Sequence, residues 1–252
     1  MIQEEVAMKP PFKERLIVAL DVDDFAKAQT LVELLKDQVA TFKVGIQLFT
    51  AWGPKVVEMI QQYGGKVFLD LKFHDIPSVV AEAVREAVKL QAFMLTLHTF
   101  GGQVMLQEAV KAAREEANRL SVQPPLLLAV TVLTSLDEEA FKEITSSPWP
   151  LREQVINLAV FARDAGMDGI VTSPQELRAI RAASRGRRLV LVAAGVRPRG
   201  ESRNDQKRIM TPREAIENGA DFIVIGRPIT QAQDPAQAAA RILKEMGEDL
   251  EK

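Results

Sequence analysis

The sequence predicts a single-domain α/β protein folded as a (β/α)8 barrel. Short apolar runs, typical of buried strands, alternate with amphipathic segments along the whole chain. Such alternation indicates a parallel sheet, because parallel strands need crossover helices. Eight strand–helix units within 252 residues match the usual size of a closed barrel. No Gly-x-Gly-x-x-Gly motif follows the first strand, which argues against an open dinucleotide-binding sheet.

The expected elements are placed by apolar runs and by helix start and stop signals. The strands are expected at 16–20, 42–45, 67–71, 93–97, 126–132, 169–172, 189–192 and 222–225. The main helices are expected at about 25–35, 53–63, 77–90, 102–120, 151–165, 174–184 and from 235 onward. Asp23 or Asp24 can cap the first of these helices, and Pro77 suits a first helical turn. Capping-box spacing occurs at Ser135 with Glu138, Ser173 with Glu176, and Thr211 with Glu214.

Composition excludes several classes of function. The net charge of −2 gives no support for binding nucleic acid or a membrane surface by bulk electrostatics. The absence of cysteine excludes disulfides, thiolate zinc sites and cysteine nucleophiles. With only two histidines, His74 and His98, a histidine-rich metal site or a Ser-His-Asp triad is not favoured.

Residues 1–14 are predicted to form a short tail before a barrel domain that spans 15–252. The tail mixes charges around Pro10 and Pro11 and lacks the apolar core of a signal peptide. No apolar run approaches the roughly 20 residues of a membrane span. We therefore expect a cytoplasmic protein.

Polar residues fall where the expected strands end, and this end of a parallel barrel holds the active site. Asp70 and Lys72 lie on the same face of their strand, since side chains alternate. Charges of both signs at a buried strand end are unfavourable unless they are paired or used in chemistry. Other expected strands end on or near Asp21, Lys43, His98 and Thr134.

Two glycine–arginine motifs follow the last two strands. They are Gly195-Val196-Arg197-Pro198 and Gly226-Arg227-Pro228. The loops after strands seven and eight of such barrels often bind phosphate, and arginine supplies a fork of donors for it. The long polar stretch 199–208 lies beside this predicted phosphate site and is a candidate lid.

The stretch Asp70-Leu71-Lys72-Phe73-His74-Asp75-Ile76-Pro77 resembles the signature of the orotidine 5′-phosphate decarboxylase family. Shorter matches, spread over about residues 16–245, are Leu20-Asp21, Phe42-Lys43-Val44-Gly45, Val130-Thr131-Val132-Leu133-Thr134-Ser135, Gly195-Val196-Arg197-Pro198, Asp205-Gln206, Arg208-Ile209-Met210-Thr211-Pro212 and Ile225-Gly226-Arg227-Pro228. The resemblance implies a TIM barrel that decarboxylates orotidine 5′-monophosphate to uridine 5′-monophosphate, the last step of de novo pyrimidine synthesis. It implies no cofactor and no metal.

The resemblance also implies roles for individual residues. Lys43, Asp70, Lys72 and Asp75 would form a charged network around the scissile carboxylate, and Lys72 would protonate C6 of the pyrimidine. Asp75 and Ile76 would reach into the partner's site of a homodimer. The implied substrate contacts are Asp21 and Lys43 for the ribose, Thr134 and Ser135 for the pyrimidine region, and Gln206, Gly226, Arg227 and Arg197 for the 5′-phosphate end.

Two alternatives remain open at this point. The sequence has Ser78-Val79 where the family usually has Asn-Thr, and Ala193-Ala194 where it tends to have Thr-Pro. These departures support a catalytically weak phosphate-binding barrel. The other alternative is a metal-dependent sugar-phosphate decarboxylase or synthase relative, in which a carboxylate replaces the lysine of the second strand. Lys43 argues against it, because a cation there would repel the metal.

Overall fold

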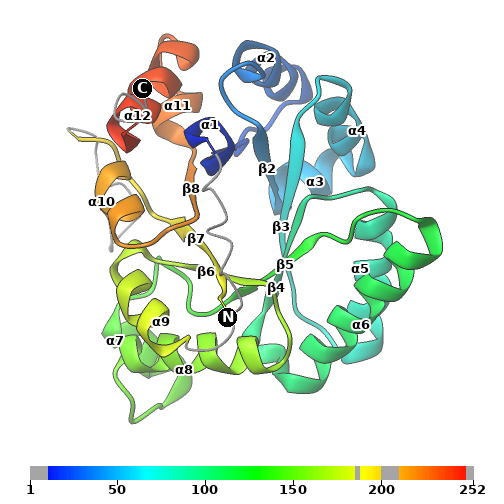
Figure 1. The fold of residues 1–252 in the computed structure, drawn as a ribbon, viewed down its shortest axis with the longest axis vertical. Helices are drawn as coiled ribbons and strands as arrows, with labels where there is room; N and C mark the ends of the chain where they lie inside the picture. The colour runs from blue at the N-terminus through cyan, green and yellow to red at the C-terminus, as the bar shows by residue number, and fades with distance from the viewer. Residues whose placement is uncertain (1–10, 185–187, 200–209, 248–252) are drawn as a thin grey trace, which may run out of the picture.

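Eight parallel strands close into a barrel in the computed structural model, which describes residues 11–184, 188–199 and 210–247. Each strand pairs with its neighbours in the sequence, and the first pairs with the last. Helices surround the strands on the outside (Figure 1). The predicted (β/α)8 barrel is confirmed.

The strands are short and buried, as their apolar runs predict. They are β1 (Leu16–Ala19), β2 (Thr41–Gly45), β3 (Lys66–Phe73), β4 (Met94–His98), β5 (Leu126–Val130), β6 (Gly169–Thr172), β7 (Val190–Ala194) and β8 (Phe222–Ile225). The predicted strand ends lie within about two residues of these bounds.

The helices follow the strands in the expected order. They are α1 (Phe12–Arg15), α2 (Phe25–Leu35), α3 (Ile46–Trp52), α4 (Pro54–Gln62), α5 (Pro77–Lys89), α6 (Gly102–Leu120), α7 (Glu138–Thr145), α8 (Leu151–Asp164), α9 (Leu177–Ala183), α10 (Pro212–Glu217), α11 (Arg227–Thr230) and α12 (Pro235–Met246), with short 3-10 helices η1 (Thr99–Gly101) and η2 (Pro174–Glu176). Asp24 caps α2 by accepting from the amide of Lys27, and Pro77 occupies the first turn of α5. Both predicted signals are confirmed.

One of the three predicted capping boxes is present. Thr211 and Glu214 bond reciprocally at the start of α10. The prediction for Ser135 is wrong, because Asp137 caps α7 instead, accepting from the amide of Ala140. The prediction for Ser173 is also wrong, since its hydroxyl accepts from Gln175 at the start of η2.

The segment before β1 packs onto the barrel from Phe12 onward. Phe12 is buried in the core, and the buried Arg15 donates from Nη2 to the carbonyl of Ala220 at 2.8 Å. Packed structure therefore starts a few residues before the predicted boundary at 15. Residues 1–10 of the predicted tail lie outside the described residues.

The lower part of the barrel interior is filled by side chains. Ile17, Phe68, Met94, Leu128 and Val192 form one buried cluster. Ile17, Phe68, Leu128 and Val192 each precede by two positions a residue that lines the cavity described below, so side-chain alternation directs them into the barrel. This layer closes the barrel beneath the cavity and makes a solid floor.

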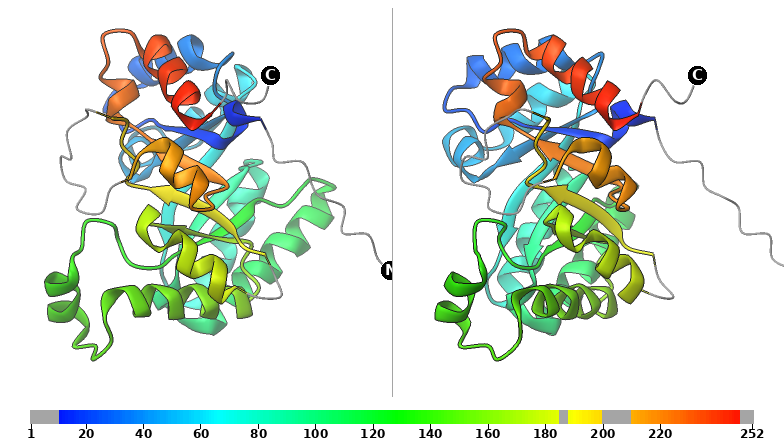
Figure 2. Two further views of the ribbon diagram at one scale, coloured as in Figure 1. Left: turned by 60° about the vertical axis from the view of Figure 1, so that its left-hand side comes forward. Right: turned by 90° about the vertical axis from the view of Figure 1, so that its left-hand side faces the viewer.

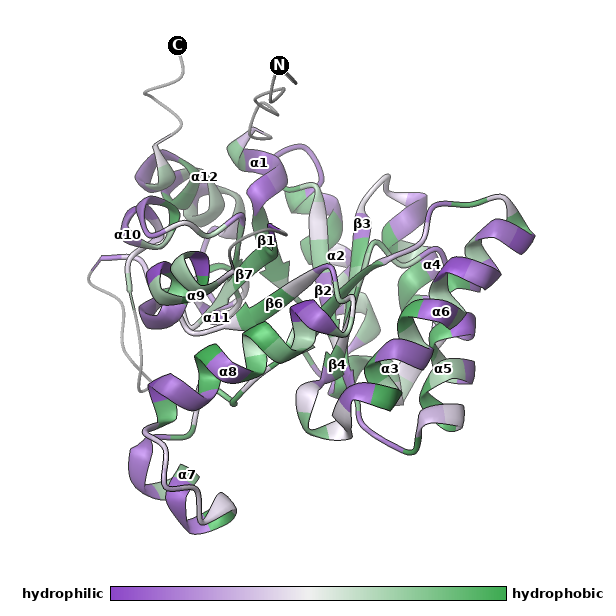
Figure 3. Cartoon of the chain, turned by 60° about the horizontal axis from the view of Figure 1, so that its bottom comes forward, coloured by the Kyte–Doolittle hydropathy of each residue, from purple (hydrophilic) through white to green (hydrophobic). Residues whose placement is uncertain are grey.

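Helix α7 stands apart from the other helices. It follows β5 and lies at one end of the molecule, away from the barrel strands (Figure 2). Hydropathy colouring shows hydrophobic residues on the strands and on inward helix faces, whereas α7 is largely hydrophilic (Figure 3). The connection from β5 to α8 is therefore longer than a plain barrel needs, and it carries part of the cavity wall at its start.

Candidate active site

A cavity of about 510 Å³ opens at the carboxyl ends of the strands, where the sequence predicts the site. Its walls come from the ends of β1, β2, β3, β5, β6, β7 and β8 and from the loops that follow them. The volume suits a small organic ligand.

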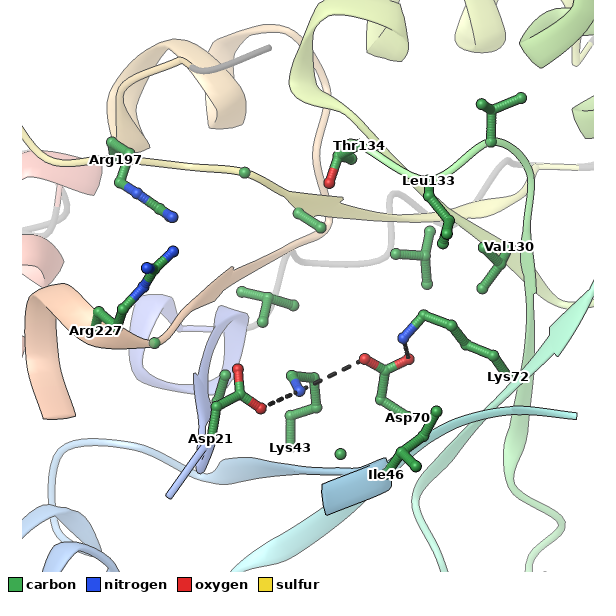
Figure 4. A pocket seen from close by; sticks show the side chains of 18 of the residues that line it. Asp21, Lys43, Ile46, Asp70, Lys72, Val130, Leu133, Thr134, Arg197 and Arg227 are labelled. Atoms are coloured by element: carbon green, nitrogen blue, oxygen red, sulfur yellow. Dashed lines mark hydrogen bonds and ion pairs between the residues drawn. The ribbon is translucent and has the colours of Figure 1, made fainter. Parts of the chain in front are cut away.

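Four charged side chains form a row along one wall of the cavity (Figure 4). Lys43 Nζ lies 2.9 Å from Asp21 Oδ1 and 3.5 Å from Asp70 Oδ2. Lys72 Nζ lies 2.8 Å from Asp70 Oδ1. The charges alternate in sign along the row, so each buried charge faces an opposite one.

The two inner members of the row stay charged because they are paired. Burial lowers the pKa of Lys43, but Asp70 and Asp21 outweigh this effect and the pKa is raised overall. Burial raises the pKa of Asp70, but Lys43 and then Lys72 outweigh it, and the pKa lies below its ordinary value. At neutral pH the cavity therefore holds a half-buried carboxylate beside a buried ammonium group.

Two arginines lie at the end of the cavity next to Asp21, away from Lys72 (Figure 4). Arg197 follows β7, and Arg227 is the first residue of α11, directly after Gly226. Both side chains point into the cavity in Figure 4. Arg197 is buried, and its Nη1 donates to the carbonyl of Val196 at 2.9 Å. Two guanidinium groups at one end of a cavity form a site for an anion such as phosphate.

Much of the remaining cavity wall is apolar. The apolar lining residues are Val130, Val132, Leu133, Val171 and Val224. In Figure 4, Val130 and Leu133 lie above Lys72, and the polar Thr134 lies nearer to Arg197. Sequence reasoning did not assign these apolar residues to the site, because an apolar strand end cannot be distinguished from an ordinary core strand. Such a wall can hold the face of a flat heterocycle.

Two further lining residues also escaped sequence reasoning. Gly45 leaves room for the charged row, since a Cβ there would lie 3.2 Å from both Asp21 Oδ1 and Lys43 Nζ. Gln231 lines the cavity four residues after Arg227, and that helical spacing could have indicated it.

Most predicted site residues come together in this cavity, and three of the described ones do not. Asp21, Lys43, Asp70, Lys72, Thr134, Arg197, Gly226 and Arg227 line it. Ser135 is exposed and lies outside the lining. Asp75 and Ile76 are also exposed and outside it, and Asp75 Oδ1 accepts from the amide of Ile76 at 2.6 Å. Gln206, with most of the predicted lid at 199–208, lies outside the described residues.

The two histidines lie beside the site and stack on each other. Their ring centroids are 5.3 Å apart, and His98 also stacks on Phe100 at 5.4 Å. Burial, then His74 and then Lys72 lower the pKa of His98 to about 4. His98 is therefore neutral at physiological pH, which favours the structural role over proton transfer.

The donor set of the site does not suit a metal ion. Lys43 Nζ lies between the carboxylates of Asp21 and Asp70, where an ammonium group repels a divalent cation. Within the described ranges, no group of three or more histidine, aspartate or glutamate side chains could hold a metal ion. Over the same ranges, every helix is too short or too polar to span a bilayer.

The fold and the cavity define a (β/α)8-barrel protein with an alternating lysine–carboxylate row and an anion site in one cavity. A family model described as "Orotidine 5'-phosphate decarboxylase / HUMPS family" matches residues 14–242. An orotidine 5′-phosphate decarboxylase of Moorella thermoacetica is 50% identical over 245 residues, which cover 97% of this chain and 96% of that protein. Another, from Syntrophomonas wolfei, is 49% identical over 94% of this chain and 99% of the other.

A solved structure gives the same result. The crystal structure of orotidine 5′-phosphate decarboxylase from Lactobacillus acidophilus is 34% identical, with a TM-score of 0.80, over 93% of this chain and 99% of that one. The chain belongs to the orotidine 5′-phosphate decarboxylase family. The resemblance found in the sequence is confirmed.

Proposed function

We propose that this protein is a carboxy-lyase that converts orotidine 5′-monophosphate to uridine 5′-monophosphate and carbon dioxide, the last step of de novo pyrimidine synthesis. The observation that carries the proposal is the Lys43–Asp70–Lys72 row in one cavity with Arg197 and Arg227. Relatives about 50% identical over nearly the whole chain carry the same activity in their names.

The chemical step needs a cation and an anion at the reacting carbon. The C6–carboxylate bond breaks, carbon dioxide leaves, and its electron pair stays on C6. The ammonium group of Lys72 stabilises this charge and then donates its proton to C6. Asp70 remains ionised beside it, and its negative charge disfavours the substrate carboxylate relative to neutral carbon dioxide.

The remaining contacts would orient the nucleotide. Arg227 and Arg197, with Gly226 and Gln206, would bind the 5′-phosphate. Asp21 and Lys43 would bind the ribose hydroxyls, and Thr134 with Ser135 would face the pyrimidine. The apolar lining supports this placement, since Val130 and Leu133 lie near Lys72 and can contact the pyrimidine ring. Binding energy from the remote phosphate can then support the chemical step.

A homodimer with shared sites is part of the proposal. In it, Asp75 and Ile76 complete the partner's charged network and substrate site. Their exposure supports this role, since Ile76 is 62% exposed directly before α5. The role of the product in biosynthesis supports a cytoplasmic location.

The two alternatives have less support. The metal-dependent relative would need a carboxylate where Lys43 makes two ion pairs. The weak phosphate-binding barrel rests on Ser78-Val79 and Ala193-Ala194. Neither departure removes a member of the charged row.

The test is turnover of orotidine 5′-monophosphate by the purified protein in the presence of a chelator, followed by the change in ultraviolet absorbance. We expect turnover without added metal. A Lys72→Ala variant should lose nearly all activity and still bind uridine 5′-monophosphate, because it lacks the general acid and keeps the phosphate site. A folded wild-type protein with no turnover would reject the activity, and near-normal turnover by the variant would reject the role of Lys72.

A further inference from the structure

Lys72 lies at an irregularity in β3. The register of β3 with β4 passes from Leu69 opposite Leu95 to Phe73 opposite Leu97, so β3 advances by four residues while β4 advances by two. Lys72 has a φ of 50° in this bulge. The left-handed region is uncommon for a residue with a side chain and persists where the surroundings hold it.

The side chain of Thr96 bonds to the backbone of the bulge. Thr96 is fully buried at the middle of β4, directly opposite the bulge. Its hydroxyl accepts a hydrogen bond from the backbone amide of Lys72 at 2.9 Å. The same hydroxyl donates to Asp70 Oδ1 at 3.0 Å.

In these two hydrogen bonds the oxygen of the hydroxyl accepts and its hydrogen is donated. Asp70 Oδ1 accepts both from Thr96 and from Lys72 Nζ at 2.8 Å, while Oδ2 faces Lys43. One hydroxyl therefore fixes the backbone of the lysine and the carboxylate that pairs with its ammonium group. A bulge beside an active site commonly re-aims a side chain, and here the re-aimed residue is Lys72.

We propose that Thr96 is a positioning residue for the decarboxylation. Through its hydroxyl it holds the bulge that presents Lys72 to the cavity and sets the orientation of the Asp70 carboxylate. Thr96 is fully buried and does not line the cavity, so it acts through these two residues. This inference rests on the proposed function, since it assigns Lys72 and Asp70 to that reaction.

Thr96→Val tests the proposal, because valine keeps the shape and removes the hydroxyl. We expect kcat to fall about 10- to 100-fold, as small misplacements of a reacting group do. The affinity for uridine 5′-monophosphate should stay within about threefold, because the phosphate and ribose contacts are unchanged. Thr96→Ser keeps both hydrogen bonds and should stay within about threefold of the wild-type kcat.

Thr41→Val is the matched control. Thr41 is a fully buried strand threonine on β2, and its hydroxyl has no hydrogen-bond partner among the described residues. The kcat of Thr41→Val should equal that of the wild type. The acid limb of the pH profile of kcat/KM should move to higher pH in Thr96→Val alone, because Asp70 loses a hydrogen bond that favours its ionised form.

The outcomes separate this inference from the proposed function. A wild-type protein without turnover rejects the function. An active wild type with a fully active Thr96→Val variant rejects only the positioning role. An equal loss in Thr96→Ser, which keeps the hydroxyl, and in Thr96→Val, which keeps the methyl group, would show that the hydroxyl has no special role and would also reject it. If Thr96→Val does not fold, Thr96→Ala takes its place in the same comparison.

Discussion

At the residue scale, the ion pairs of Asp70 with Lys43 and Lys72 keep the groups of the proposed reaction charged. Asp70 and Lys72 could be paired from the sequence, because side chains two apart on a strand share a face. Lys43 could be added because a parallel barrel brings neighbouring strand ends together. The left-handed backbone of Lys72 could not be predicted, since no glycine or asparagine marks it. From the sequence, Thr96 could not be distinguished from an ordinary strand residue, because the two hydrogen bonds of its hydroxyl depend on the bulge in β3.

The titration of His98 is a prediction at this scale. Its pKa is lowered to about 4, first by burial and then by His74 and Lys72. Between about pH 4 and the ordinary value of 6.5 the unfolded chain binds a proton that the folded chain does not. The free energy of unfolding should therefore rise with pH across this window. The stability that the neutral His98 contributes above pH 6.5 is lost as the pH falls toward 4.

Nuclear magnetic resonance can follow this titration directly, because the chain has only two histidines. A His74→Gln variant assigns the signals. We expect the His98 imidazole to remain neutral at pH 6 and to take up a proton near pH 4. Removal of the neighbouring His74 should move the midpoint upward somewhat, since His74 is one of the causes of the shift. A midpoint near 6.5 in the wild type would contradict a half-buried, neutral His98.

At the scale of secondary-structure elements, most features that the sequence did not predict lie in the connections between strands and helices. All eight strands were predicted, because a buried parallel strand gives a continuous apolar run between turn signals. The helix expected from Gly53 is α4, but a further helix, α3, precedes it and was not predicted; Gly53 lies between the two with a φ of 55°. The glycine was visible in the sequence, but the preceding helix starts directly at the end of β2 without a loop to mark it. The cap of α7 was misplaced by two residues for a similar reason, since Ser135 and Asp137 both offer a capping side chain.

The turn between β8 and α11 leads to a prediction for the phosphate site. Arg227→Ala should weaken binding of uridine 5′-monophosphate about 10- to 100-fold, the range expected from a lost charge-assisted hydrogen bond. Free phosphite should partly restore turnover of a substrate that lacks the phosphate, and this restoration should be weaker in the variant. Arg241→Ala, an exposed arginine on α12, is the control and should bind normally. Unchanged binding by Arg227→Ala would reject its assignment to the phosphate.

An apolar rim near the mouth of the barrel points to assembly at the scale of the whole molecule. Ile76, Val79, Phe100 and Val104 are between 46% and 62% exposed. They lie at the start of α5, in η1 and at the start of α6, in the segments that follow β3 and β4. Exposed apolar side chains gathered near a site are typical of an interface. The sequence alone could not reveal this rim, because whether an apolar residue at a helix start is exposed depends on the packing around it.

Mixing two inactive variants tests whether sites are shared across such an interface. In Asp70→Asn each site lacks its own carboxylate, whereas in Asp75→Asn each site lacks the one supplied by the partner. A hybrid dimer then has one site that is broken twice and one that is whole. Equal mixing with free exchange makes half of the dimers hybrid, so activity should return to about one quarter of the wild-type value.

The alternative arrangement gives a different result. If Asp75 served the site of its own chain, both sites of every hybrid would remain broken, and mixing would restore nothing. Each variant mixed with itself is the control for refolding or carry-over. Because Asp75 lies outside the cavity of its own chain, we expect recovery in the mixed sample only. That recovery would require the stretch from Asp70 to Ile76 to serve two sites, with Asp70 and Lys72 acting in one subunit and Asp75 in the other.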